Sequence, residues 1–599
     1  MEIEFEKKTR AASEVDGEKW VYDSSIDNEG RIPLRASTGA WKASLFIIAI
    51  EFSERLTYFG IATNLIIYLT KILHQDLKTA AKNVNYWAGV TTMMPLIGGF
   101  LADAYLGRFS AILGSSIIYL MGLGLLTMSE FIHKMKPCSS ETCDRSSKIH
   151  GVVFFVAMYL ISVGTGGHKP SLESFGADQF DEDHSEERKK KMSYFNWWNS
   201  SLCCGLILGV TVIVYVEDYV SWGIADIILT FVMAISIIIF IVGRPFYRYR
   251  VPEGSPLTPM LRVMVAAIAK RNLPYPSNPA ELYGFAKSQK TDKRSLCHTN
   301  KLRFLDKAAI VEDHDDMETQ SVEKQNKWRL ASVTEVEEMK LVLNMVPIWI
   351  SALPFGICVA QGSTFFIKQG STMNRKITNN FTLPPATIYS FAAVAMVIIV
   401  CIYDKILVPI LRRVRGNERG ISILQRIGIG MTLTAVAMVF AAIIERKRLH
   451  VAKGEMLRGG LTSALPMSVF WLAPQYMILG IGDGFALVGL QEYFYDQVPD
   501  TMRSLGIAFY LSVLGASNFL SGFLITIVDH LTERKGSSGW LGKDLNSSRL
   551  DRFYLLLAAI TGLNLCSYVY LASRYSYKNV EKRVVDADSY GRKRVVSTP

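Results

Sequence analysis

The feature that most constrains this chain is a series of long, nearly uncharged apolar segments separated by shorter polar ones. A helix of about 20 apolar residues crosses the hydrocarbon of a bilayer, and this sequence offers roughly twelve such segments. Backbone groups in lipid must be satisfied within the chain, so each segment should be a helix. The sequence predicts an all-α polytopic membrane protein with transmembrane helices near residues 43–70, 84–106, 109–131, 150–169, 194–216, 221–243, 338–366, 385–409, 422–445, 466–495, 503–530 and 552–573.

Charge supports the membrane interpretation and sets an orientation. The net charge of +11 would also suit a nucleic-acid partner, but the basic residues gather between the apolar segments, where positive charge marks the cytosolic side. We therefore expect the lipid bilayer, and no nucleic acid, as a partner. Residues 1–40 contain no signal-peptide core, which favours a cytosolic N-terminus. Both termini are predicted to be cytosolic, although Arg446, Lys447 and Arg448 then fall on the opposite side.

A long polar stretch divides the predicted helices six and six, which is the layout of the major-facilitator fold. Within this stretch, residues 258–273 predict either a helix lying on the membrane surface or a linker helix packed on cytosolic loops. The expected organisation is a cytosolic tail (1–42), a first six-helix bundle (43–243), a cytosolic linker (244–337), a second six-helix bundle (338–573) and a second cytosolic tail (574–599).

The first predicted helix carries an unusual cluster of ionisable residues. Glu51, Glu54 and Arg55 share one helix face at positions i, i+3 and i+4, and Tyr58 extends that face by a turn. Each charge at the bilayer centre costs about 2.5–3.5 kcal/mol, so the three must pair and face a polar space. Glu51 can pair with Arg55, which leaves Glu54 able to exchange a proton. The pattern indicates a proton relay; the alternative is a static buried ion network.

Two further charges lie within apolar segments, one in each half. Lys169 follows His168 in GTGGHKP, and Asp483 lies among glycines in GIGDGF. A salt bridge between Lys169 and Asp483 could break and re-form as the halves move. The simpler alternatives are a packing role for His168 and Lys169 and a helix cap or kink at Asp483.

Three other sets of residues complete the candidate list. Asp103 and Arg108 lie at a cytosolic turn, where they can latch neighbouring helix ends together. Cys138 and Cys143 lie in a polar loop outside the cytosol and form a possible disulfide. No residue spacing indicates a metal site, a cofactor or an enzymatic nucleophile.

Several longer motifs are spread over nearly the whole chain: EFSER, GGFLADAYLGR, GTGGHKP, FGADQF, LDKAAI, LQRIGIG, PQYMILGIGD and LQEYFYDQVP. In these motifs the chain resembles the proton-coupled peptide transporter family, in its plant nitrate and peptide transporter branch. WVYDSS and QEYFYDQVPDTMRSLGIAFYLSV are similar to the fifth plant subfamily.

The resemblance implies roles for individual residues. Glu51, Glu54 and Arg55 match the proton-coupling motif, and Arg55, Tyr58, Lys169, Gln361 and Asp483 are the expected substrate contacts. Three positions depart from the pattern. Val359 stands where the best-known plant nitrate transporter has a nitrate-binding histidine, Ala111 stands where it has a phosphorylated threonine, and Asp483 replaces a glutamate of many relatives.

The sequence therefore predicts a symporter, not an enzyme, whose partners are protons and a small anionic or zwitterionic solute. Nitrate and di- or tripeptides are the expected substrates; plant hormones, specialised metabolites and a non-transporting sensor with the same fold are the alternatives. The plasma membrane and the vacuolar membrane both fit, and the oligomeric state is left open.

Overall fold

The computed structural model contains twelve long helical segments in the part of the chain that it describes, which is residues 19–23, 25–132, 144–181, 184–252, 254–255, 257–275, 282–283, 298–311, 328–415, 421–457, 465–498, 503–533, 539–542 and 544–575. The first half of the bundle is built from α2 (Ala40–Lys71), α3 (Leu77–Leu101), α4 (Arg108–Phe131), α5 (Asp144–Ala177), α6 (Ser185–Leu208) continuing into α7 (Val214–Tyr219), and α8 (Trp222–Val242). The second half is built from α12 (Val333–Ala360) with α13 (Phe365–Thr372), α14 (Ser390–Ile402) with α15 (Val408–Arg415), α16 (Ile423–Leu457), α17 (Ala473–Gln497), α18 (Arg503–Thr532) and α19 (Leu550–Arg574).

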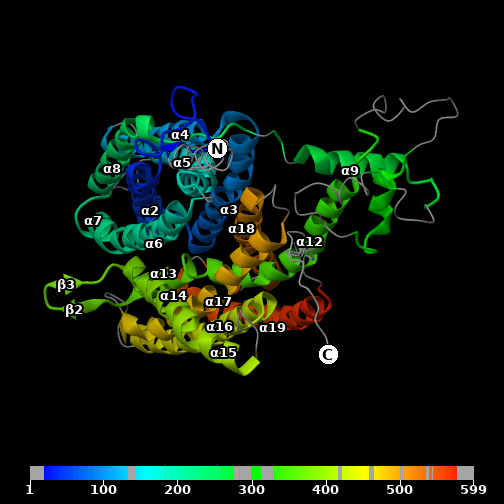
Figure 1. The fold of residues 1–599 in the computed structure, drawn as a ribbon. Coiled ribbons are helices and arrows are strands. Elements are labelled where there is room, and N and C mark those ends of the chain that lie inside the picture. The colour runs from blue at the N-terminus through cyan, green and yellow to red at the C-terminus, as the bar shows by residue number, and fades with distance from the viewer. Residues whose placement is uncertain are drawn as a thin grey trace, which may run out of the picture. The chain divides into compact units, whose positions relative to one another are not determined.

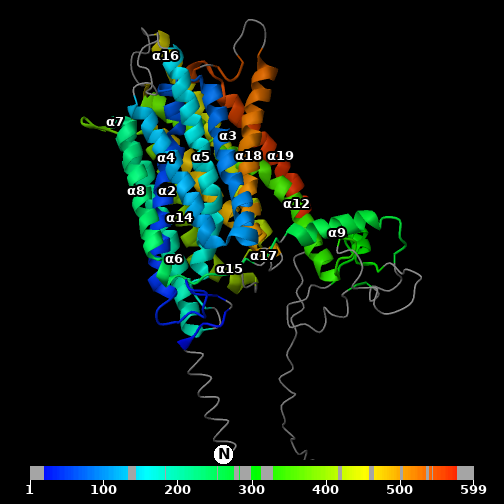
Figure 2. The same cartoon turned by 90° about the horizontal axis from the view of Figure 1, so that it is seen from above.

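These helices are of the kind that crosses a membrane. Nine segments within the described residues are long and apolar enough to do so by length and composition. The long helices α2, α3 and α17 complete the set of twelve; α2 carries the buried Glu51 and Glu54, and α17 carries the buried Asp483. The helices run side by side in Figure 2, and Figure 1, viewed along them, separates α2–α8 from α13–α19. This is the predicted all-α polytopic architecture with two halves of six.

Close helix contacts in the first half depend on glycine. A Cβ atom on Gly98 of α3 would lie 2.3 Å from the backbone of Gly166 in α5. Because glycine has no side chain, the backbones of the two helices can come this close. α5 also packs extensively along α4. The motifs around Gly98 and Gly166 therefore hold α3 and α5 together, next to the charged segment of α2.

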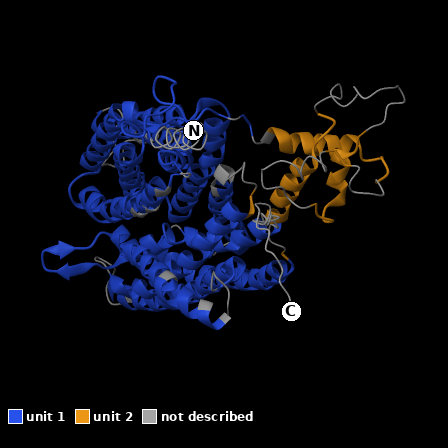
Figure 3. Cartoon of the chain, viewed as in Figure 1, with its two compact units in different colours: residues 1–255, 347–496, 502–574 blue, residues 256–346, 497–501, 575–599 orange. Residues whose placement is uncertain are grey.

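The linker forms a second compact unit, built from the described residues between 257 and 346 (Figure 3). Its helix α9 (Leu257–Ala269) packs Val263 and Ala266 against the short helix η5 (Arg303–Ala309) and the first turns of α12. The helix predicted at 258–273 is therefore present, but it ends at Ala269, and it packs on the linker through one face. Leu261 and Ile268 on its other face are exposed.

An N-terminal segment folds back on the first half before α2 begins. Ile26 pairs with Tyr249 after α8, and the fully buried Arg248 donates to Glu187 Oε2 at 2.7 Å. Gln179, in the FGADQF motif, accepts from the backbone N–H of Arg248 at 2.8 Å. This network joins the ends of α5, α6 and α8.

Small strands occur only in the second half of the described chain. β1 (Met373–Asn374) pairs in parallel with β4 (Leu465–Ser468), and β2 (Lys376–Thr378) pairs with β3 (Phe381–Thr382) in an antiparallel hairpin. They lie in the connections between membrane helices and leave the architecture all-α.

Several predicted helix boundaries were wrong. α6 begins at Ser185 instead of residue 194, and α16 ends at Leu457 instead of residue 445. Two others lie next to prolines. The helix expected to end at residue 169 continues through Pro170 to Ala177, and Pro170 lies against Gly99, whose missing side chain leaves room for the proline ring. The helix expected from residue 466 begins at Ala473, after β4 and a 3-10 turn (Val469–Leu472). Pro474 is then the second residue of the helix, where a missing N–H has no cost.

Candidate functional site

The charged residues of α2 form one compact cluster. Arg55 Nε lies 2.6 Å from Glu51 Oε1 and 3.2 Å from Glu54 Oε2. Both glutamates are fully buried, and the Arg55 side chain is 13% exposed. Within the described residues, neither oxygen of Glu54 has a hydrogen-bond donor, and Glu51 Oε2 has none either. One guanidinium thus compensates two carboxylates, and three of their four oxygens accept no hydrogen bond from the described residues.

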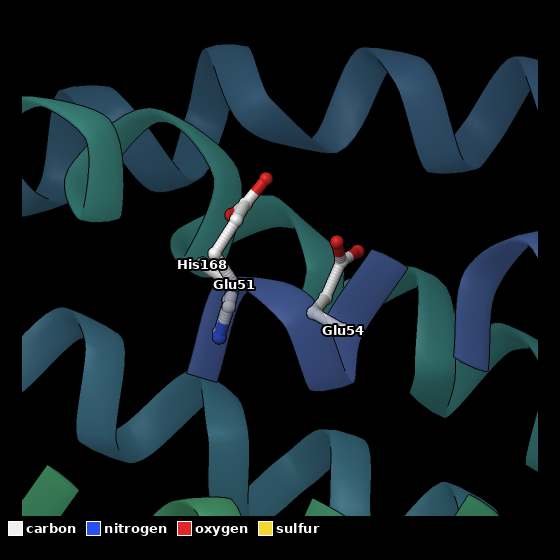
Figure 4. A group of neighbouring side chains, drawn as sticks. All are labelled: Glu51, Glu54 and His168. Atoms are coloured by element: carbon white, nitrogen blue, oxygen red, sulfur yellow. The ribbon is translucent and has the colours of Figure 1, made fainter. Parts of the chain in front are cut away.

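His168 of α5 joins this cluster. One of its ring nitrogens and one carboxylate oxygen from each glutamate lie within 4.8 Å of one another (Figure 4). His168 is fully buried, and neither ring nitrogen is hydrogen-bonded to any residue that the structure describes. These three side chains could ligate a metal ion, but the Arg55 guanidinium already contacts both glutamates, so a metal would compete with it.

Lys169 lies beside the cluster on an aromatic surface. Its Nζ is 4.1 Å from the centre of the Tyr58 ring, a cation–π contact. Tyr58 in turn stacks on Trp87 of α3, with ring centres 6.0 Å apart. Glu173 stands one turn beyond Lys169 on the same helix. Sequence reasoning missed Trp87 and Glu173, although the i, i+4 spacing of Lys169 and Glu173 was a visible signal.

Asp483 lies in the middle of α17 and is almost fully buried. Its neighbours Gly480 and Gly484 pack against α14, where a Cβ would lie 2.1 Å from Ala392 O and 2.6 Å from Ile399 Cγ2. Asp483 Oδ1 has no hydrogen-bond partner in the described part of the chain. A mid-helix position rules out a capping role.

The structure does not bring Lys169 and Asp483 together. Lys169 contacts Tyr58 instead, and no ion pair links the two charges, both of which the structure describes. The two residues stand on different halves, on α5 and α17. This conformation therefore lacks the proposed bridge between the halves.

Gln361 follows the end of α12 and takes part in a contact between the halves. Its Nε2 donates to Ile357 O at 2.8 Å and to Ser521 Oγ at 3.1 Å, and Ser521 also accepts from Asn85 Nδ2 of α3 at 3.0 Å. Gln361 Oε1 has no hydrogen-bond donor within the described residues. In this conformation the amide nitrogen is engaged within the protein.

Asp103 and Arg108 lie at the turn between α3 and α4. Arg108 Nε contacts Asp103 Oδ1 at 3.1 Å, and Arg108 also pairs with Asp178, which follows α5. Arg250 Nε approaches Asp178 Oδ1 at 3.3 Å. These ion pairs join helix ends within the first half. Cys138 and Cys143 lie outside the described residues.

A second group of possible metal ligands lies in the linker unit. His298, Asp306 and Glu337 each present a ligand atom within 4.8 Å of the others. The Lys340 ammonium lies among them, 2.6 Å from Asp306 Oδ1 and 2.8 Å from Glu337 Oε1. A buried lysine thus already supplies the positive charge.

Fold and buried charges together define an integral multi-pass membrane protein with the major-facilitator fold. A family model described as the POT family (PTR2) matches residues 109–541. The chain is 61% identical over 566 residues to the Arabidopsis thaliana protein NRT1/PTR FAMILY 5.6, covering 94% of this chain and 96% of that protein. It is also 61% identical to NRT1/PTR FAMILY 5.7 of the same plant, covering 94% and 93%. The chain belongs to the POT family of transporters.

Solved structures agree on the fold. An auto-inhibited POT family peptide transporter matches with a TM-score of 0.64 at 19% identity, covering 90% of this chain and 98% of that one. The POT family transporter PepTSo matches with the same TM-score and identity, covering 88% and 98%.

Proposed function

We propose that this chain is a proton-coupled symporter that moves a small anionic or zwitterionic solute, nitrate or a di- or tripeptide, by alternating access. The observation that carries the proposal is the shared guanidinium of Arg55, which lies between two buried carboxylates on a membrane helix. Ionisable residues at membrane depth are costly and mark ion and proton pathways.

Glu54 is the proposed proton carrier, because both of its oxygens lack hydrogen bonds from the described residues while Arg55 stays within 3.2 Å. A proton on Glu54 removes one of the two charges that Arg55 compensates. The guanidinium donors are then available to an anionic group of the solute. Loss of the proton draws Arg55 back to its glutamates and releases the solute. Glu51 anchors Arg55 throughout.

The other proposed solute contacts divide by charge. Lys169 and Tyr58 stand beside Arg55 and suit an anionic group. Asp483, on the other half, suits an amine, and Gln361 presents its carbonyl oxygen. A zwitterion matches both signs, whereas nitrate uses the cationic side alone. A larger aromatic anion is the second candidate, because the half-buried ring of Tyr58 lies next to Lys169.

Asp103 and Arg108 are the proposed conformational latch, and we place the protein in the plasma membrane or the vacuolar membrane with both termini cytosolic. The basic segments between the helices support this orientation.

The decisive test is uptake into proteoliposomes with an imposed pH gradient, using nitrate, di- and tripeptides and aromatic anions in parallel. We expect one solute class to accumulate only when protons flow inward. Glu54→Gln should remove most of this accumulation while preserving counterflow exchange, which moves no net proton. Glu186→Gln, an exposed carboxyl paired with Lys189, is the control. Uptake that ignores pH in the parent, or that survives unchanged in E54Q, contradicts proton coupling.

A further inference from the structure

The two halves are joined toward one end of the bundle, where α2 ends and α3 begins; we call this the α2–α3 end. At this end Lys78 Nζ lies 2.8 Å from Asp529 Oδ2, and deeper in the bundle Asn85 donates to Ser521. α3 and α18 approach closely along this seam, because a Cβ on Gly522 would lie 2.6 Å from the Tyr86 ring. The seam between α3 and α18 is thus a packed interface that ends in an ion pair.

The Lys78–Asp529 pair differs from the other contacts of the seam because it carries full charges. Lys78 stands in the first turn of α3, and Asp529 stands in the last turn of α18. Their side chains are 31% and 19% exposed, so both reach water. Either charge is readily hydrated when the pair separates, which makes this contact reversible.

A second contact joins the halves at the same end. Lys368 of α13 donates to Thr70 Oγ1 near the end of α2 at 2.9 Å. The neighbouring Gln369 donates to Glu445 Oε2 at 2.6 Å. Glu445 is fully buried and takes two hydrogen bonds from Arg448. α13 is thereby fixed within the second half and presents Lys368 to the first.

We propose that Lys78 and Asp529 form the gate of the α2–α3 end: the ion pair holds the halves together at this end, and it breaks each time they separate there. The gate rests on the proposed alternating access. The two residues hold the halves in place and do not contact the solute, since they lie at helix ends, away from the positions of Glu54 and Asp483 within their helices.

The test measures opening without measuring transport. Ser521→Cys places a thiol at a fully buried seam position, and its reaction rate with a hydrophilic maleimide is followed in the full-length protein in nanodiscs. Each rate is compared with that of the same protein lacking the added cysteine. Lys78→Gln and Asp529→Asn should each raise the rate about two- to fivefold, the range expected for a partly exposed ion pair. The exchanged pair, K78D together with D529K, should return it to the parental value.

The control is Arg549→Gln, which removes an ion pair of similar exposure to Asp551 within the second half. It should leave the labelling rate unchanged. The gate is overturned if K78Q and D529N label like the parent, or if the exchanged pair labels like the single variants. Labelling that follows the expected pattern in a protein that transports no solute supports the gate and counts against the proposed function.

Discussion

Arg55 is the residue on which the charge balance of α2 depends. It is the cation in contact with two buried carboxylates, at 2.6 and 3.2 Å. Removing one partner of a buried ion pair typically costs about 3–5 kcal/mol, because the remaining charge stays out of water. Here one substitution would strand two carboxylates.

Arg55→Gln should therefore destabilise the protein by about 3–5 kcal/mol, seen as a lower thermal unfolding midpoint in detergent. The double variant Glu51→Gln with Arg55→Gln should recover part of the loss, since one stranded carboxylate is gone. A double variant that is less stable than R55Q would show that Glu51 has another role in the fold.

Asp483, unlike Arg55, is a buried charge with no ion-pair partner among the described residues. Its Oδ1 lacks a hydrogen bond in the described chain, and no described cation pairs with it. Asp483→Asn keeps the shape and removes the charge, so the unfolding midpoint should stay equal or rise while uptake falls. A site that is costly to the fold but needed for activity behaves in this way. Lower stability together with unchanged uptake would assign Asp483 a structural role.

Local spacing at the residue scale was predictable from the sequence, and long-range partners were not. The i, i+4 relation of Glu51 and Arg55 gave their pairing, which the structure contains. Tyr58 as the partner of Lys169 depends on how α5 packs on α2, which no local pattern encodes.

Two of residues 446–448, the basic run on the side opposite to the predicted orientation, make contacts within the second half. Arg448 is fully buried and paired with Glu445, and Lys447 Nζ lies 3.3 Å from the centre of the Trp471 ring. Arg448 is therefore part of the packed second half, whereas Lys447 lies at the surface, and the orientation stays a prediction.

At the scale of the element, glycine decides how α17 packs. A Cβ on Gly480 would lie 2.1 Å from the backbone oxygen of Ala392 in α14. Backbone atoms cannot move aside as a flexible side chain can, so the helices must separate. The position of Asp483 in the bundle depends on this contact, since it lies one turn away on the same helix.

Gly480→Ala should cost about 1–3 kcal/mol, the usual range for overpacking a well-packed site. The matched control is Gly562→Ala in α19, where a new Cβ meets nothing within 4 Å. That control should be neutral or slightly stabilising, because alanine favours a helix over glycine. Thermal unfolding of both variants in the same detergent makes the comparison, and equal midpoints would contradict the packing argument.

Element boundaries were less predictable than element existence. Apolar length identified the twelve helices, because lipid forces each long apolar segment into one. Pro170 misled the prediction, because a proline inside a helix loses one backbone hydrogen bond and often ends the helix. α5 continues through it, with the proline ring packed against Gly99 of α3. Pro474 could have corrected the start of α17, as proline favours the first turn of a helix.

At the scale of the whole molecule, the halves should move as bodies. Contacts inside each half join several helices at once, as between Thr127 of α4 and Thr230 of α8, whose hydroxyls lie 2.9 Å apart. Contacts between the halves include those along α3 and α18, where Asn85 donates to Ser521 at 3.0 Å. Alternating access requires the second kind to break while the first kind persists.

A reversible cross-link distinguishes the two kinds of contact. Asn85→Cys with Ser521→Cys, joined by a short bifunctional thiol reagent, should abolish most uptake, and a reductant should restore it, because the link ties one half to the other. The same reagent on Thr127→Cys with Thr230→Cys should leave uptake nearly unchanged, since both positions belong to one half. Uptake that persists through the first cross-link would mean that the halves do not separate along this seam, and the transport cycle would have to proceed by motions within each half.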